Sequence, residues 1–178
     1  MSEADARSLP DVLTIQRPEQ LKALGHPLRL RVLETLGAGT SEHLTNRELA
    51  QKLGVDPGHL HFHVRMLLKA GLIELAEGDQ GREKPYRAVA RTVRVAPELL
   101  ASGLTTDLRA AMLDEVQRGW EKWAPEGKFR SAQVTARVPE ERMLEFITEL
   151  VDKARDAEVD DAQPIVITTV FHPPTTPG

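Results

Sequence analysis

Apolar residues recur at helical spacing through the first half of the chain, and glycine and proline divide this pattern into short segments. A first helix is predicted from Pro18 to a break at Gly25-His26-Pro27. A second runs from Pro27 to about Leu36, because proline suits the first position of a helix and apolar residues on more than one side indicate burial. Residues 1–17 have no sustained periodicity and are predicted to form a flexible N-terminal arm, in which Val12, Leu13 and Ile15 could pack locally.

Two short helices with well-marked ends follow. Thr45-Asn46-Arg47-Glu48 has the form of a capping box, and Gly54 ends this helix in the left-handed conformation. Asp56 caps the next helix, Pro57 takes its first position, and Gly71 closes it. Two capped helices joined by a three-residue turn predict a helix-turn-helix.

A polar hairpin is predicted directly after the second of these helices. Residues 72–75 are typical of a short strand, and residues 86–90 of its returning partner. The polar residues 78–85 between them have the composition of a hairpin tip, which is the form of a wing. Residues 18–95 are therefore predicted to be a winged helix-turn-helix domain.

The second half of the chain has a longer helical pattern followed by alternation. Apolar residues from Leu104 to Trp123 predict a long amphipathic helix, and residues 130–138 alternate as in a half-buried strand. Pro139 opens another helix, and residues 164–171 are predicted as a last strand.

The expected fold class is α+β. It consists of an N-terminal winged helix-turn-helix and a C-terminal helical and small α/β (strand-helix-strand) module over residues 96–172. Residues 173–178 are predicted to be a disordered tail, because they are mostly proline, threonine and glycine at a chain end.

The charge distribution favours a nucleic-acid partner for the first half only. The whole chain has a net charge of −4, but residues 1–95 carry 14 basic and 12 acidic side chains, and the remainder carries 9 and 15. Phosphate neutralisation depends on where Lys and Arg lie, so a basic face can coexist with an acidic module that is directed away from DNA.

The second helix of the helix-turn-helix carries the strongest candidates for DNA contact. At 100° per residue, Leu60, Val64 and Leu67 share one side. The opposite side carries Gly58, His59, Phe62, Arg65, Met66 and Lys69, with His61 and His63 on the two flanks. The N-terminal part of such a helix enters the major groove. The residues predicted to contact DNA, from this helix and from the wing, are His59, His61, Phe62, His63, Arg65, Lys69, Arg82 and Lys84.

Three of these candidates have alternative roles. Arg65 could bind a guanine through two hydrogen bonds or bind a phosphate, since the guanidinium geometry suits both. Phe62 could contact a thymine methyl group, or pack against the wing or another helix. His63 lies toward the edge of the core, where it could bond the backbone or a phosphate.

Neither a metal site nor a cofactor is expected. The chain has no cysteine, which excludes disulfides and thiolate ligands. His59 and His63 are four positions apart, a spacing that can place two imidazoles on one metal, but no nearby acidic residue at a recognisable spacing completes the set.

The sequence also argues against catalysis and against a membrane. It has no glycine-rich phosphate loop, no nucleophile elbow and no histidine–carboxylate set at a catalytic spacing, so an enzyme is not expected. It has no apolar run near the roughly 20 residues that cross a bilayer, and its start lacks the features of a secretory signal. A cytoplasmic location is therefore predicted.

An ordered set of motifs resembles the ArsR-like family of bacterial and archaeal winged-helix regulators. The motifs are Leu24-Gly25-His26-Pro27-Leu28-Arg29, Glu48-Leu49-Ala50, His63 and Lys69-Ala70-Gly71-Leu72-Ile73, and the match covers about residues 18–94. The resemblance implies a transcriptional regulator, usually a homodimer, that binds double-stranded DNA.

This sequence departs from the family pattern in ways that affect function. The family commonly has serine at the position of His61 and a polar residue at Phe62, so the operator sequence stays open. The cysteines, or the later His and carboxylate sets, of the family's metal sensors are missing. A homodimeric repressor that does not sense metals is therefore the expected type.

The module over residues 96–172 has two possible roles. It could set the geometry of a homodimer or bind an effector, with Trp120 and Trp123 as the candidate residues. Alternatively, it could chiefly bind a protein partner or a small molecule, with DNA binding secondary. Ordinary packing of both tryptophans is the third possibility.

Overall fold

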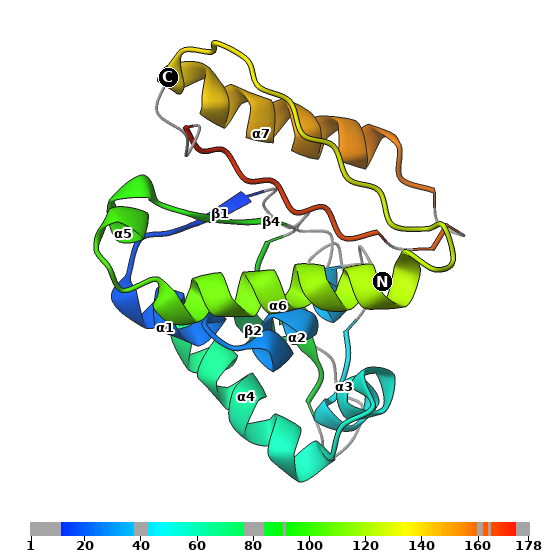
Figure 1. Ribbon diagram of the computed structural model, residues 1–178. Coiled ribbons are helices and arrows are strands. Elements are labelled where there is room, and N and C mark those ends of the chain that lie inside the picture. The colour runs from blue at the N-terminus through cyan, green and yellow to red at the C-terminus, as the bar shows by residue number, and fades with distance from the viewer. Residues whose placement is uncertain are drawn as a thin grey trace, which may run out of the picture. The chain divides into compact units, whose positions relative to one another are not determined.

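The computed structural model describes residues 12–37, 43–76, 84–90, 92–159, 162–163 and 165–173 (Figure 1). The chain divides into two compact units, residues 1–115 and 116–178. The described residues contain seven helices and two small sheets, which confirms the α+β class. None of these helices is long and apolar enough to cross a membrane.

Among the described residues, the first unit contains all the strands, five whole helices and the beginning of a sixth. Its elements in chain order are β1 (Val12–Ile15), α1 (Pro18–Leu24), α2 (Pro27–Gly37), α3 (Asn46–Leu53), α4 (Pro57–Ala70), β2 (Ile73–Leu75), β3 (Tyr86–Ala88), β4 (Thr92–Val95), α5 (Pro97–Ala101) and the start of α6 (Thr106–Trp123).

The ends of α3 and α4 are capped as the sequence predicts. The Thr45 hydroxyl accepts a hydrogen bond from the Glu48 N–H at 3.3 Å, and the Glu48 carboxylate accepts one from the Thr45 N–H at 2.8 Å. The Asp56 carboxylate accepts a hydrogen bond from the His59 N–H at 2.8 Å. Gly54 and Gly71 end the two helices with φ angles of 66° and 70°, where residues with a Cβ are strained.

The predicted hairpin is confirmed as an antiparallel pair of β2 and β3, with Ile73 opposite Ala88 and Leu75 opposite Tyr86. Both strands are shorter than the sequence pattern suggested. An ion pair of 2.7 Å between Glu74 and Arg87, which are direct partners in this register, holds the two strands together. Most of the predicted tip, residues 78–83, lies outside the described residues.

The prediction of a flexible arm is wrong for its last part. Residues Val12–Ile15 form β1, which pairs in parallel with β4. The Arg94 guanidinium donates a hydrogen bond to the Thr14 hydroxyl at 2.9 Å, and Ile15 is fully buried. A strand of four residues is too short to produce a visible period, and its partner lies about 80 positions away, so the local pattern does not predict it. Residues 1–11 lie outside the described residues.

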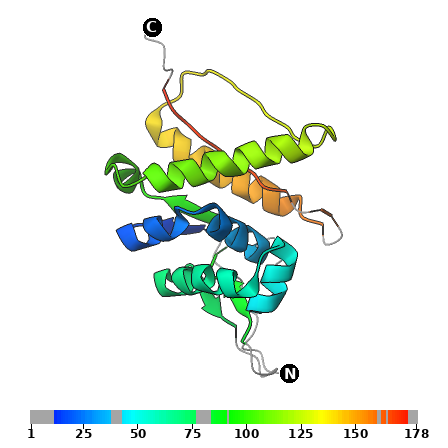
Figure 2. The ribbon, with the colours of Figure 1, turned by 60° about the horizontal axis from the view of Figure 1, so that its bottom comes forward.

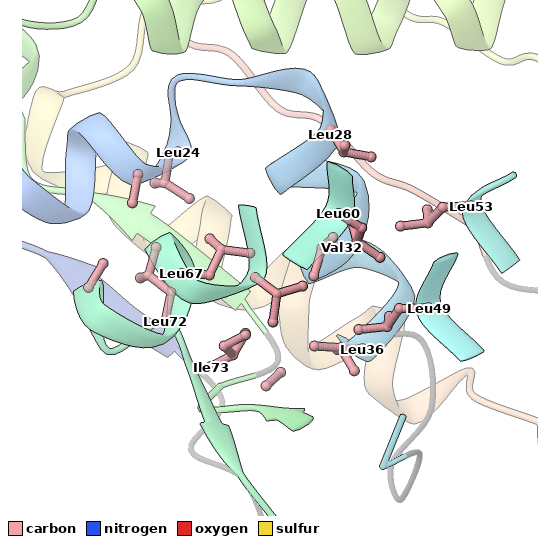
Figure 3. Packing of buried hydrophobic residues seen from close by; sticks show 14 of the residues in the cluster. Leu24, Leu28, Val32, Leu36, Leu49, Leu53, Leu60, Leu67, Leu72 and Ile73 are labelled. Carbon is pink, nitrogen blue, oxygen red and sulfur yellow. The ribbon is translucent and has the colours of Figure 1, made fainter. Parts of the chain in front are cut away.

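One hydrophobic core joins α1 to α4 with the hairpin. Figure 3 shows side chains from α2, α3 and α4 converging around Val32 and Leu60. The start of α6 adds Leu108 and Ala111, which are both buried. The largest fully buried side chains are Ile15, Leu21, Val32, Leu36, Leu49, Leu60, Val64, Leu67, Leu72 and Ile73.

The second unit contains the end of α6 and α7 (Glu140–Asp156), which confirms the helix predicted after Pro139. The two strands predicted beside it are wrong: residues 130–138 and 165–171 form no strand, and both segments are drawn as plain trace in Figure 2. Their apolar side chains are exposed, Val134 by 86% and Ile165 by 78%. Alternation predicts extended backbone, but a strand also needs a hydrogen-bonded neighbour, which the alternation does not reveal.

Candidate nucleic-acid interface

The helix-turn-helix of α3 and α4 is held by hydrogen bonds at its turn and between its helix starts. The Val55 N–H bonds the Ala50 carbonyl at 3.0 Å, which fixes the chain after Gly54. The side-chain amide of Asn46, at the start of α3, donates to the Pro57 carbonyl at the start of α4 at 2.8 Å. These bonds fix the angle at which α4 leaves the turn.

Helix α4 has a fully buried side and an exposed side. Leu60, Val64 and Leu67 are completely buried in the core, and Figure 3 shows Leu60 and Leu67 among the packed side chains. The side chains exposed on this helix include His59, His61, Phe62, Arg65 and Lys69, which we call the outer face of α4. The structure therefore groups five of the sequence candidates on one helix and leaves them accessible to a partner.

Phe62 is the most unusual residue of the outer face. Its side chain is 64% exposed, so the described residues leave most of the ring uncovered. The ring meets the buried His63 edge-on, with 5.6 Å between ring centroids. A large apolar side chain in water is unfavourable, so Phe62 stays a candidate for contact with a partner.

His63 does not lie on the outer face. It is 5% exposed, and its ring lies 4.4 Å from that of His26 and 5.0 Å from that of His59. Burial, helped by the charges of His26, Arg29 and His59, lowers the pKa of His63 to about 4. His63 is therefore neutral at pH 7, and its predicted place among the DNA contacts is wrong because the side chain turns into the protein.

The buried partner of His63 is Arg29, which is not among the candidate residues predicted from the sequence. Arg29 is only 6% exposed, and its guanidinium lies 3.5 Å from Nδ1 of His63. A signal was present, since an arginine occurs inside the apolar run Leu28-Arg29-Leu30 of a helix predicted to be buried. A charge in such a place needs specific hydrogen-bond partners.

Of the two wing candidates, only Lys84 lies within the described residues. Lys84 is exposed just before β3. Arg82 lies outside the described residues. The hairpin that carries the wing is continuous with the core, because Ile73 and Ala88 are both buried.

The two tryptophans both lie in the second unit, around the end of α6. Trp120 is 56% exposed, and its ring meets Phe129 edge-on at 5.1 Å. The ammonium groups of Lys122 and Lys128 lie 4.5 Å and 5.1 Å from the centre of the Trp123 ring, at cation–π distance. The two rings thus have separate local environments, and Trp120 keeps an open surface.

Within the described ranges, no group of three or more His, Asp or Glu side chains is arranged to hold a metal ion. This includes the three neighbouring imidazoles of His26, His59 and His63. The Nδ1 atom of His26 already accepts a hydrogen bond from the Leu28 N–H at 3.1 Å.

Comparison with known proteins finds a family match within the first unit. Residues 24–76 match a family model described as a helix-turn-helix domain. This span contains α2, α3, α4 and β2, so the chain carries a helix-turn-helix domain at the place where the outer face lies. No curated protein matches the chain.

A solved structure, that of the transcriptional regulator PA3341, also matches. The two sequences are 20% identical, and the alignment covers 72% of this chain and 77% of that one. The TM-score is 0.32, which is too low to support a conclusion about this chain.

Proposed function

We propose that this protein is a sequence-specific DNA-binding transcriptional regulator of the ArsR-like type, a homodimeric repressor that contacts the major groove through the outer face of α4. The observation that carries this proposal is the exposed Phe62, which lies among His59, Arg65 and Lys69 on the second helix of a matched helix-turn-helix domain. An outer face with aromatic, imidazole and cationic side chains can contact both base edges and phosphates.

Each residue of the outer face has a chemically distinct partner on a duplex. Arg65 can donate two hydrogen bonds to O6 and N7 of guanine, and the Phe62 ring can cover a thymine methyl group. His59 lies in the first turn of α4, where a recognition helix is closest to base edges. Lys69, near the end of the helix, suits a phosphate.

The wing is proposed to contribute phosphate contacts through Arg82 and Lys84. Such contacts release counterions. Each contact steepens the slope of log affinity against log salt concentration by about 0.9. We expect Lys84→Ala to weaken binding to specific and random duplexes equally. If the double variant Arg82→Ala, Lys84→Ala keeps the wild-type slope, the wing is not part of the interface.

We propose that residues 96–172 form the dimerisation module. Among the described residues from Val116 onward none is buried, and many large apolar side chains are exposed. Apolar surface of this extent is typical of a partner site. A second copy fits the proposed function, because one recognition helix covers too few base pairs to specify a site and two related by a two-fold axis contact half-sites about one helical turn apart.

A second candidate function for this module is effector or protein binding, which the open face of Trp120 favours. A ligand would have to bind the DNA-bound and free forms with different affinities to regulate the protein. Quenching or shift of tryptophan fluorescence by a ligand, lost in Trp120→Phe, would identify this role.

The proposal is tested by selecting bound fragments from a random DNA pool and measuring fluorescence anisotropy with the selected site and with a scrambled one. We expect a large preference for the selected site in the wild type. Arg65→Ala should lose discrimination at one base pair, by about 1–3 kcal/mol if it binds guanine. Lys153→Ala, at an exposed position of α7, is the matched control. Failure to enrich any sequence would overturn sequence-specific binding.

The non-metal-sensing character is tested separately. We expect zinc, nickel, arsenite or a chelator to leave the DNA affinity nearly unchanged. A several-fold metal-dependent change that His59→Ala abolishes would show that the outer face senses metal.

A further inference from the structure

The guanidinium of Arg29 lies at the junction of α1, α2 and α4. It donates hydrogen bonds to two carbonyl oxygens at the end of α1, those of Ala23 and, at 3.0 Å, Lys22. Its Nη1 atom lies 3.5 Å from Nδ1 of His63 and 3.5 Å from the Met66 sulfur. One planar cation thus connects the C-terminal end of α1 to the side of α4.

The protonation of this bridge follows from its geometry. A guanidinium only donates hydrogen bonds, so a hydrogen bond at this contact requires Nδ1 of His63 to accept and the imidazole proton to lie on Nε2. The C-terminal end of a helix carries partial negative charge, which stabilises the cation beside the Lys22 and Ala23 carbonyls. Burial lowers the pKa of Arg29, and the charge of Asp107 at the start of α6 raises it. Arginine stays charged in proteins, so the bridge is cationic.

The bridge adds a directional constraint on the rotation of α4 to the apolar packing of the core. Leu60, Val64 and Leu67 hold the helix by apolar contact, which is not directional. The guanidinium fork has fixed donor directions, and it meets α4 at two positions one turn apart, His63 and Met66. His63 is buried and Met66 is half-buried.

We propose that Arg29 is a positioning residue of the DNA interface: fixed on the carbonyl end of α1, its guanidinium holds His63 and Met66 and thereby sets the rotation at which α4 presents Phe62 and Arg65 to the major groove. This inference rests on the proposed function. It predicts that loss of the bridge reduces base discrimination more than it reduces phosphate binding, because phosphate contacts tolerate small rotations and base-edge hydrogen bonds do not.

The test compares Arg29→Met with Arg94→Met in the full chain. Arg94 is a matched control, since it is a half-buried arginine whose side chain bonds Thr14 on β1 and not α4. At a temperature where both variants are folded by circular dichroism, we expect Arg29→Met to lose at least tenfold in affinity for the selected site and less than twofold for random DNA. Arg94→Met should keep the wild-type ratio of the two affinities.

Arg29→Lys sharpens the same test. Lysine keeps the charge but has one donor atom, which cannot reach the α1 carbonyls and His63 together. We expect it to discriminate as poorly as Arg29→Met. Wild-type discrimination in Arg29→Lys would overturn the proposal, because charge alone would then suffice.

A nuclear magnetic resonance measurement separates this inference from the proposed function. Long-range ¹H–¹⁵N correlations report which imidazole nitrogen carries the proton. We expect the wild type and Arg94→Met to have the His63 proton on Nε2, and Arg29→Met to lose this single tautomer. If the wild type binds no duplex, the proposed function fails, while this signature still decides whether the bridge exists.

Should Arg29→Met fail to fold, His63→Gln and His63→Leu provide the same comparison from the other end of the bridge. Glutamine keeps an acceptor for the guanidinium and leucine removes it. We expect His63→Gln to keep most of the discrimination and His63→Leu to lose it. Equal discrimination by the two variants would contradict a positioning role for Arg29.

Discussion

Helices α4 and α7 are both amphipathic and of similar length, yet only α4 has fully buried side chains. Helix α4 has 14 residues and buries Leu60, Val64 and Leu67 completely. Helix α7 has 17 residues, none of which is buried, and Leu144 and Phe146 are exposed. An apolar stripe indicates that a helix needs a partner surface. The described part of the chain covers the stripe of α4 completely, but it covers that of α7 only in part, since Met143, Ile147, Leu150, Val151 and Ala154 are half-buried.

The difference separates two kinds of functional surface. On α4, the buried side fixes the helix so that its opposite side can be presented to a ligand, and this opposite side carries the DNA candidates. On α7, the apolar side is only partly covered, with Leu144 and Phe146 exposed, and the proposed partner for the exposed part is a second copy.

The largest expected effect is on the core beneath α4. Leu60→Ala should lower the free energy of unfolding by about 2–5 kcal/mol, since it leaves a cavity at a fully buried position. Leu150→Ala on α7, where the side chain is only half-buried, should cost less than about 1.5 kcal/mol when measured at low protein concentration. Urea unfolding followed by circular dichroism measures both. Equal losses would remove the contrast between the helices.

The next effect is a pH dependence of stability that is specific to α4. The pKa of His63 is about 4 in the folded chain, against an ordinary value of 6.5, because burial and the neighbouring His26, Arg29 and His59 disfavour its charged form. Between these two pH values the unfolded chain binds the extra proton, so stability falls as the pH drops from 6.5 to 4. The expected loss is on the order of 1–3 kcal/mol.

His63→Gln should remove much of this slope, and His61→Gln at an exposed position of the same helix should keep it. Chemical unfolding at pH 7, 6, 5 and 4 gives the three curves. A wild-type slope in His63→Gln would mean that other groups cause the acid sensitivity.

A smaller effect is expected on association through α7. Phe146→Glu places a charge on the apolar side and should weaken dimerisation at least tenfold, which corresponds to about 1.4 kcal/mol. Glu149→Gln, on the exposed polar side, should leave it unchanged. Sedimentation velocity over a range of concentrations measures the dissociation constant. A wild type that sediments as a monomer at high concentration would contradict the proposed dimer directly.

The smallest expected effect concerns the helix ends. Asp56→Ala removes the side chain that accepts the His59 N–H and should cost about 1 kcal/mol, while Asp56→Asn should cost little. Helix α7 has Pro139 at the equivalent position with no side-chain bond, so Pro139→Ala should lose no cap. Thermal unfolding by calorimetry detects this difference, and a similar cost for Pro139→Ala would show that capping is not what distinguishes the two starts.

The features that the sequence predicted well are those determined by neighbours along the chain. The capping box at Thr45 and Glu48, the cap at Asp56 and the stop at Gly71 each depend on residues within one helical turn. The separation of α4 into a buried side and an outer face follows in the same way from helical periodicity. Local chemistry therefore sufficed for the helix-turn-helix and for most of the candidate interface.

The features that the sequence did not predict depend on distant residues. Strand β1 exists because β4 offers it hydrogen bonds from far along the chain. His63 lies at the edge of the helical wheel, and its inward position depends on contacts with residues distant in sequence, Arg29 and His26. Residues 130–138 have the alternation of a strand, but the pattern does not say whether a neighbouring strand is present.

The central claim, that the outer face of α4 recognises base edges, is tested most directly by replacing each thymine of the selected site with uracil, which lacks the methyl group. We expect the wild type to lose affinity at one thymine of each half-site, and Phe62→Ala to bind the thymine and uracil sites equally. Arg65→Ala should keep the uracil effect and lose discrimination at a different base pair. Discrimination that is the same in the wild type, Phe62→Ala and Arg65→Ala would contradict recognition through this face.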